Sequence, residues 1–416
     1  MQRIKQVLVL IIVFACFGMS SKKDNTVLYE GLLYTDQSPV RIEVTNGKIS
    51  AIKKISGSSA KNLKLFIAPG LIDNQVNGYA GVTFSQGDAA FTEEDVLKVT
   101  RALWKEGVTT FLPTLRTNDQ QYLIRNLKVL AKAKLNPATH GSIAGFHLEG
   151  PYISKEDGYR GAHALKYVRD ADLSSFMELY DASGKNILQV TLAPEAPGAM
   201  EFIKMCRQKN IVAAIGHHNA SAALISQAID NGARIATHLG NALANQISRR
   251  DNPLWPQLSD DRLMISIICD GLHLLPEQVR VFYKVKGVSR TIITSDVDKY
   301  AGMAPGKYLN AEGDTIQLTT EGAVMYVARN SLSGSASPIT KGVGNIMKFT
   351  GCTMADAFTM GSTNAAHLYG LSDRGELKVG MRADLILFTM DDQKINIKKT
   401  VVQGDPVYDA NNKIKL

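Results

Sequence analysis

Cysteine and tryptophan are scarce in this chain of 416 residues, which has four of the former and two of the latter. The cysteines, Cys16, Cys206, Cys269 and Cys352, form no C-x-x-C pair and stand far apart, so we expect neither a disulfide framework nor a thiolate zinc site. There is no run of five Lys or Arg residues, and aromatic residues are not interleaved with basic ones. Despite a formal net charge of +8, we therefore expect no nucleic-acid partner.

Long hydrophobic runs are also missing, with one exception at the N-terminus. Residues 7–19 are nearly all apolar, follow Arg3 and Lys5, and precede a polar stretch, which is typical of a secretory signal. The run is shorter than the roughly 20 residues that a membrane-spanning helix needs. Cys16 follows Val-Phe-Ala and is a candidate for lipidation. We expect residues 1–25 to direct export of the protein, which would then be periplasmic or a membrane-anchored lipoprotein. A lipid on Cys16 would be its only contact with the membrane. The alternative is a cytoplasmic protein.

The composition of the whole chain, with 45% hydrophobic and 21% charged residues, is typical of a globular protein. Its length is sufficient for two or three domains or one large barrel. The sequence patterns near both ends of the chain predict short strands separated by turns. Asn46 and Gly47 form a hairpin turn between two apolar runs. We expect residues 26–67 and 372–416 to form one small β-sandwich domain.

The long middle part, residues 68–371, alternates short apolar runs with helical segments such as residues 93–107, 221–232 and 338–351. Eight βα units predict a closed (β/α)₈ TIM barrel of the α/β class rather than an open sheet. The eight strand-like runs are APGLIDNQVNG, VTTFLPTL, SIAGFHLEG, ILQVTLAPEA, IVAAIGHHN, ARIATHLGN, LMISIICDG and RTIITSDVD.

Chemically capable side chains stand at the ends of these runs. In a TIM barrel the C-terminal ends of the strands meet at one mouth, where catalytic groups gather from distant parts of the sequence. Histidine and carboxylate are the usual nitrogen and oxygen ligands of a catalytic zinc, which keeps three protein ligands. Glu149, His217 and His238 end the third, fifth and sixth runs. We expect these three residues to hold a metal.

The motifs together resemble those of the N-acetylglucosamine-6-phosphate deacetylases of the amidohydrolase superfamily. The resemblance covers about residues 26–405, and the eight strings occur in the family's order. They are PGLIDNQVNGYAG, GFHLEGPY with RGAH, GHHNA, THLGNA, DGLH, SDV, SLSGSASP and GELKVGMRADLILF. The resemblance implies a metal-dependent enzyme that removes the acetyl group from an amino sugar.

The resemblance also implies catalytic roles. Asp296 would accept a proton from water and pass it to the leaving amine, and His163 would hold the acetyl carbonyl oxygen. Gln75-x-Asn77 stands where a binuclear amidohydrolase has His-x-His. Because amides are poor ligands compared with imidazole, we expect one divalent metal per subunit, zinc first, with iron or cobalt as alternatives.

The resemblance places the sugar phosphate against a second group of residues. His273 is expected to enter from a neighbouring subunit, which implies a homodimer. The residues assigned to substrate binding are Gln75, Asn77, Ala162, His163, Asn241, Ala242, Arg249 and His273.

Two features leave the substrate open. The loop of residues 244–258, which carries Arg249, is unlike the family's, and an exported enzyme would seldom meet a phosphorylated sugar. The alternatives are an exported amidohydrolase acting on another N-acetylated sugar or N-acyl compound, and a non-catalytic, lipid-anchored glycan-binding protein.

Overall fold

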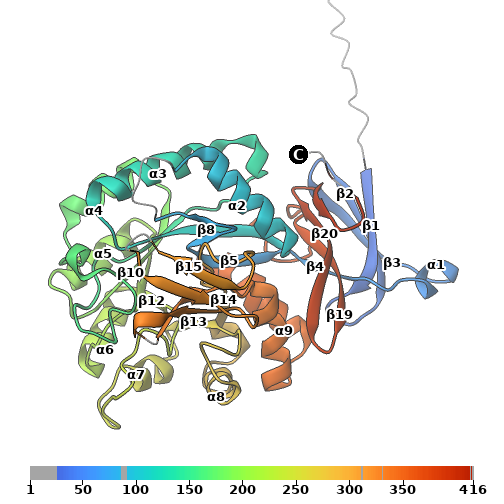
Figure 1. Cartoon of the computed structure of the whole chain (residues 1–416). Coiled ribbons are helices and arrows are strands. Elements are labelled where there is room, and N and C mark those ends of the chain that lie inside the picture. Colours follow the sequence, from blue (N-terminus) through green and yellow to red (C-terminus); the bar gives the residue numbers. More distant parts are fainter. Residues whose placement is uncertain (1–25, 86–90, 311–312, 330, 413, 415–416) are drawn as a thin grey trace, which may run out of the picture.

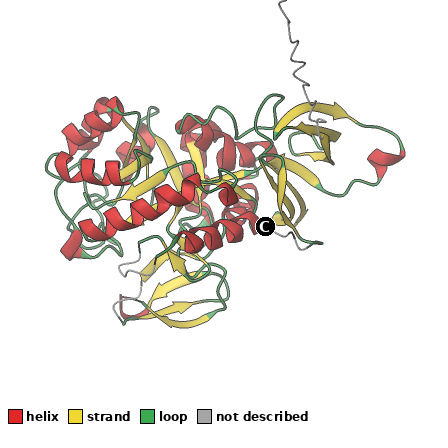
Figure 2. Ribbon diagram, turned by 90° about the horizontal axis from the view of Figure 1, so that it is seen from above, coloured by secondary structure: helices red, strands yellow, loops and turns green. Residues whose placement is uncertain are grey.

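The structure is a computed structural model that describes residues 26–85, 91–310, 313–329, 331–412 and 414. Two lobes make up the molecule: a large barrel surrounded by helices, and a smaller, mainly β lobe beside it that contains both ends of the described chain (Figures 1 and 2). Within these residues, no helix combines the length and the apolar character that crossing a bilayer would require. The predicted signal and Cys16 lie outside the described residues.

Eight parallel strands form the barrel, as the sequence predicted, in the spatial order β14-β13-β12-β11-β10-β9-β8-β5. A parallel bridge between Val76, at the end of β5, and Val297, just after β14, joins the two outer strands and closes the barrel. The strands are β5 (Leu71–Val76), β8 (Val108–Arg116), β9 (Phe146–Glu149), β10 (Ile187–Leu192), β11 (Val212–Ile215), β12 (Ala233–Ala236), β13 (Met264–Ile268) and β14 (Thr291–Thr294).

These strands are buried on both faces, which explains why they appear as continuous apolar runs rather than alternating ones. All six residues of β5 are buried, as are the first eight of β8. Helices follow the strands in turn and cover the outside of the barrel (Figure 1). The helices are α2 (Glu93–Lys105), α3 (Gln120–Leu135), α4 (Leu173–Ala182), α5 (Ala199–Gln208), α6 (Ala222–Asn231), α7 (Leu254–Ser259), α8 (Pro276–Lys286), α9 (Ile339–Thr350), α10 (Met354–Phe358) and α11 (Asn364–Leu368).

The smaller lobe joins the two terminal segments in one seven-stranded sheet of order β21-β20-β19-β4-β1-β2-β3. Residues of β1, β2 and β3 pack against residues of β4, β19 and β20 around a separate hydrophobic core, which confirms the predicted β-sandwich. Asn46 and Gly47 take the positive φ angles, 52° and 76°, of the predicted hairpin turn. The elements of this lobe are β1 (Thr26–Leu33), β2 (Pro39–Thr45), β3 (Lys48–Lys54), α1 (Ser58–Lys61), β4 (Phe66–Pro69), β19 (Leu385–Asp391), β20 (Lys394–Val402) and β21 (Asp405–Asp409).

One element of the barrel lobe was not predicted. Between β14 and α9 the chain forms a four-stranded antiparallel sheet, whose last strand contains the first five residues of the S-L-S-G-S-A-S-P motif. Backbone hydrogen bonds join Ser335 to Asp296 and Asp298, so this sheet fixes the segment that follows β14. The additional strands are β15 (Gly306–Leu309), β16 (Thr315–Leu318), β17 (Ala323–Tyr326) and β18 (Ser331–Ser335), with a short pair, β6 (Gly78–Tyr79) and β7 (Val82–Thr83), after β5.

Candidate active site

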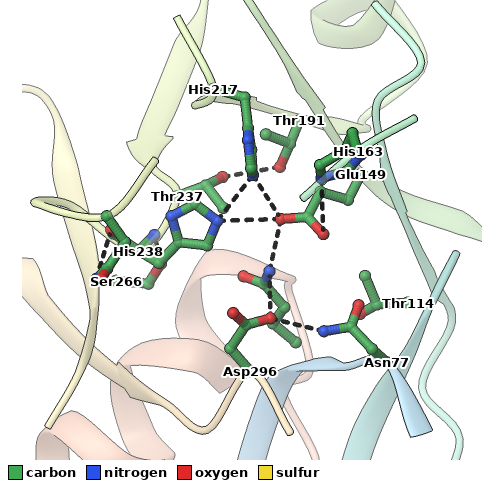
Figure 3. A network of polar contacts seen from close by, with 12 residues as sticks. Asn77, Thr114, Glu149, His163, Thr191, His217, Thr237, His238, Ser266 and Asp296 are labelled. Carbon is green, nitrogen blue, oxygen red and sulfur yellow. Dashed lines mark hydrogen bonds and ion pairs between the residues drawn. The ribbon is translucent and has the colours of Figure 1, made fainter. Parts of the chain in front are cut away.

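Three of the predicted site residues turn out of their strands at the same mouth of the barrel. His217 follows β11, His238 follows β12 and Asp296 follows β14, and their φ angles are +53°, +31° and +52°. Non-glycine residues rarely adopt positive φ, and such strain concentrates at functional sites. The left-handed turn ends each strand and directs its side chain into the mouth (Figure 3).

Glu149, His217 and His238 meet as predicted, and all three are buried. Glu149 Oε1 lies 3.2 Å from His217 Nε2 and 3.1 Å from His238 Nε2, and the two nitrogens are 3.1 Å apart. Figure 3 shows the three side chains pointing at one another from separate strands. Although burial alone raises the pKa of Glu149, its contacts with His217 and His238 hold that pKa well below its usual range, so the carboxyl group is ionised.

The chemistry of these three atoms fits a cation. His217 Nδ1 lies 3.2 Å from the backbone carbonyl oxygen of Arg160, which can only accept a hydrogen bond, so Nδ1 carries the proton. In this tautomer Nε2 carries no proton, and its lone pair faces the Glu149 carboxylate. An arrangement of this kind, with the distal ring nitrogen fixed by a carbonyl, is the one that metal-ligating histidines adopt.

The two amides at the end of β5 face the carboxylates as hydrogen-bond donors. Gln75 Nε2 lies 2.7 Å from Glu149 Oε1 and 2.8 Å from Asp296 Oδ1, and Asn77 Nδ2 lies 2.7 Å from the same Asp296 oxygen. Because an ionised carboxylate only accepts, the amide nitrogens and not the oxygens must point inward. Gln75 thus bridges the two acids, and Asn77 helps to orient Asp296.

Asp296 lies across the mouth from the histidines. Burial, and after it the charge of Glu149, raises the pKa of Asp296 to about 6. A carboxyl group whose pKa is close to the working pH is suited to accept and return a proton.

His163 stands on the other side of Glu149, with its Nε2 3.8 Å from Glu149 Oε2. Its Nδ1 lies 2.7 Å from the hydroxyl of Thr117. Burial, and next the neighbouring His217, lowers the pKa of His163 well below its usual value, so the ring is neutral. Gly150 makes this packing possible, because a Cβ at that position would lie 2.2 Å from the Thr117 hydroxyl.

A cavity of about 860 Å³ opens above these side chains. Ala162, Asn241, Ala242 and His273 line it, together with the acids and histidines already described. The expectation that His273 enters from a neighbouring subunit is wrong: it lines the cavity of its own chain, where Nδ1 pairs with Asp270 Oδ2 at 2.8 Å. The short D-G-L-H loop after β13 is long enough to turn His273 back into its own barrel mouth.

Arg249 differs from the other assigned residues. It is exposed, and it is absent from the described residues that line the cavity. Two other arginines, Arg116 at the end of β8 and Arg160, the first residue of the R-G-A-H motif, do line it. Their positions, one at a strand end and the other within a motif, could have identified them from the sequence.

Two further polar residues near the strand ends, His218 and Glu195, have structural roles. His218 is buried next to His217, and its Nδ1 accepts a hydrogen bond from the Ala220 backbone at 3.2 Å; burial lowers its pKa to about 4. Glu195 accepts from the Asn219 backbone at 2.7 Å. Neither lines the main cavity.

Comparisons with known proteins agree with this geometry. The amidohydrolase family model matches residues 66–407. The chain belongs to the amidohydrolase family. N-acetylglucosamine-6-phosphate deacetylase of Bos taurus is 31% identical over 82% of this chain and 83% of its own length, and that of Bacillus subtilis is 30% identical over 84% and 89%. This amidohydrolase therefore groups with those deacetylases and is a hydrolase of amide bonds.

Solved structures give the same result. The N-acetyl-D-glucosamine-6-phosphate deacetylase of Mycobacterium smegmatis, a variant in complex with N-acetyl-D-glucosamine-6-phosphate, is 26% identical with a TM-score of 0.81, over 92% of this chain and 99% of that one. The similarity thus extends across the barrel and the small β lobe of this amidohydrolase.

Proposed function

We propose that this amidohydrolase is a metal-dependent deacetylase that hydrolyses N-acetylglucosamine-6-phosphate to glucosamine-6-phosphate and acetate, in amino-sugar catabolism. The observation that carries the proposal is the convergence of Glu149, His217 and His238 opposite Asp296 in one cavity. The similarity to deacetylases of this substrate supports it.

The trio would hold one divalent metal, with zinc the first choice and iron or cobalt as alternatives, since a Glu-His-His set accepts all three. When bound, such a metal lowers the pKa of a water molecule to about 7 and polarises the acyl carbonyl. The first-strand position supports a single metal, because the Gln75 and Asn77 nitrogens already donate to the carboxylates.

Asp296 is the proton carrier of the proposed reaction. Both amides hold its Oδ1, which leaves Oδ2 to face the cavity as the base. It takes a proton from the attacking water and delivers that proton to the sugar nitrogen as the C–N bond breaks.

His163 positions the acyl group. When the Thr117 hydroxyl donates to Nδ1, the single proton of the neutral ring lies on Nε2. That N–H can then donate to the acyl oxygen as negative charge develops there, the role of an oxyanion-hole donor.

Three of the four residues expected to bind the sugar phosphate lie at the cavity. Asn241, Ala242 and His273 line the cavity, but Arg249 does not. Its exposure keeps a second candidate open, namely hydrolysis of another N-acetylated amino sugar by the same residues.

An acetate-release assay of the zinc-loaded protein tests both candidates. The panel would contain N-acetylglucosamine and N-acetylgalactosamine, each with and without a 6-phosphate. We expect the highest kcat/KM for N-acetylglucosamine-6-phosphate. Preference for an unphosphorylated sugar would favour the second candidate, and no acetate release from any sugar would favour the non-catalytic glycan-binding alternative.

We further propose that the chain is exported and forms a homodimer. Mass spectrometry of the native protein should find an N-terminus at a lipid-modified Cys16, or a few residues later without lipid. An intact Met1 in the soluble fraction would place the enzyme in the cytoplasm. Sedimentation equilibrium measures the oligomeric state, and a monomer at micromolar concentration would contradict the dimer.

A further inference from the structure

A second cavity adjoins the main one. Its volume is about 760 Å³, close to the 860 Å³ of the first. Arg116, Ala162 and His163 line both cavities, so these residues form the border between the two. Pockets for drug-sized ligands typically measure about 300 to 1,000 Å³, so either cavity is as large as a complete small-molecule site. The two cavities together have room for more than a monosaccharide.

Arg116 lies where the two cavities meet. Its Nη2 contacts Asp298 Oδ2 at 3.1 Å, and its backbone N–H donates to the Ser85 hydroxyl at 2.7 Å. The side chain keeps 27% of its surface exposed, although it stands beside the buried catalytic cluster. The guanidinium group has five donors in a rigid fork, and the Asp298 contact involves only Nη2. The pair therefore fixes the group without using its other donors, on a residue that lines both cavities.

The charge of the second cavity differs from that of the first. Its wall contains three basic side chains, Arg116, Lys166 and Lys299, and one acidic side chain, Asp298. The first cavity instead contains Glu149 and Asp296 beside the candidate metal position, and its other arginine, Arg160, pairs with Asp157. An anionic group would thus be attracted to the second cavity.

Aromatic rings complete the wall. Tyr122, Tyr167 and Tyr300 line the second cavity, and Lys166 Nζ lies 4.8 Å from the centre of the Tyr167 ring. Lys299 Nζ lies 5.1 Å from the Tyr300 ring. Such cation–π contacts hold the two ammonium groups along the wall. The wall thus combines flat apolar faces with fixed positive charge.

We propose that the second cavity binds an anionic substituent of the substrate, attached at carbon 1 or carbon 3 of the N-acetylated amino sugar. This inference rests on the proposed function, in which His163 faces the acyl oxygen. Because the cavities meet at His163, a group that enters the second one must leave the sugar close to the acetamido carbon. On a hexosamine, carbons 1 and 3 flank that carbon, whereas carbon 6 lies across the ring. The shared chemistry is a carboxylate or phosphate within reach of Arg116.

The test compares acetate release by the zinc-loaded protein from four sugars. The probes are N-acetylglucosamine with a lactic acid ether at carbon 3, its 1-phosphate, its 6-phosphate and the neutral sugar. We expect kcat/KM for the 3-carboxylate or the 1-phosphate to exceed that for the neutral sugar by at least about tenfold. A factor of this size corresponds to the contribution of one charge-assisted hydrogen bond. Which of the two is preferred identifies the attachment point.

Arg116→Gln should reduce that preference roughly tenfold to a hundredfold. The double variant Arg116→Gln/Asp298→Asn, which leaves no unpaired buried carboxylate, should show the same reduction. Arg101→Gln is the matched control, because Arg101 is on the outer helix α2 in an exposed pair with Glu94. Its selectivity should equal that of the wild type.

The outcomes separate the inference from the proposed function. Acetate release with no preference for the 3-carboxylate or the 1-phosphate would overturn the inference alone. The inference would also be overturned if both the single variant Arg116→Gln and the double variant kept the preference of the wild type for the anionic sugar. No acetate from any of the four sugars would overturn the proposed function instead.

Discussion

The cluster of Glu149, His217 and His238 and the segment of residues 244–258, a loop that continues into α7, stand at the same mouth of the barrel but are built differently. The cluster residues lie at or just after three barrel strands and are almost fully buried, with side-chain exposures of 3%, 6% and 4%. The loop is largely exposed around Arg249, whose carbonyl oxygen accepts from Trp255 Nε1 at 3.2 Å. In the cluster the strands determine the geometry, whereas in the loop mainly local hydrogen bonds do.

The difference has a physical consequence. Moving a strand end requires the barrel to be repacked, which close-packed interiors resist. Moving an exposed loop requires only a few local hydrogen bonds to change. We therefore expect the reaction to depend steeply on the cluster, and substrate preference to depend more weakly on the loop.

The largest effect should follow from His238→Ala. Loss of one of three ligands should remove the metal and reduce acetate release to background, whereas elemental analysis of the wild type should give about one divalent metal per chain. The matched control is His218→Ala, another buried histidine that lies outside the cavity. Equal metal loss in both variants would contradict the assignment of His238, and two metals in the wild type would contradict the role of Gln75 and Asn77.

Asp296→Asn should have the next largest effect. The amide keeps the shape but cannot accept the proton, so kcat should fall roughly a hundredfold to ten-thousandfold while the metal stays bound. Asp157→Asn, at the cavity rim with a side chain 91% exposed, should change kcat little. An active Asp296→Asn enzyme would show that another group carries the proton.

Gln75→Met should have a smaller effect. The substitution preserves approximate size but removes the donors to Glu149 and Asp296, at 2.7 and 2.8 Å. Groups that orient metal ligands typically contribute about tenfold to a hundredfold in affinity or activity, and we expect a loss of that size. Titration of the zinc-free protein with zinc measures the affinity. If Gln75→Met kept the zinc affinity and the kcat of the wild type, Glu149 and Asp296 would not need Gln75 for their orientation.

Arg249→Ala should have the smallest effect, and it tests the loop side of the comparison. Because Arg249 is exposed and outside the cavity, we expect KM for N-acetylglucosamine-6-phosphate to rise about tenfold at most, with the neutral sugar unaffected. Arg250→Ala, its exposed neighbour, is the control. A hundredfold rise would show that the loop reaches the phosphate in the working enzyme.

The sequence by itself determined the barrel and the composition of the catalytic cluster. Eight apolar runs separated by helices predict eight parallel strands, and such strands bring their C-terminal ends together. Glu149, His217, His238 and Asp296 could therefore be placed at one site without coordinates. The hairpin turn at Asn46 and Gly47 could also be predicted from the sequence, because the positive φ angles of such a turn favour these two residue types.

Only the tertiary structure decided what each loop brings to that mouth. Nothing in the local pattern shows that His273 turns into its own barrel, that Arg249 stays outside the cavity, or that Arg116 connects two cavities. The sheet β15–β18 was missed for the same reason. Strand ends are positioned by the regular hydrogen bonding of the barrel, which the sequence period encodes, whereas a loop's path depends on contacts with residues far away in the chain.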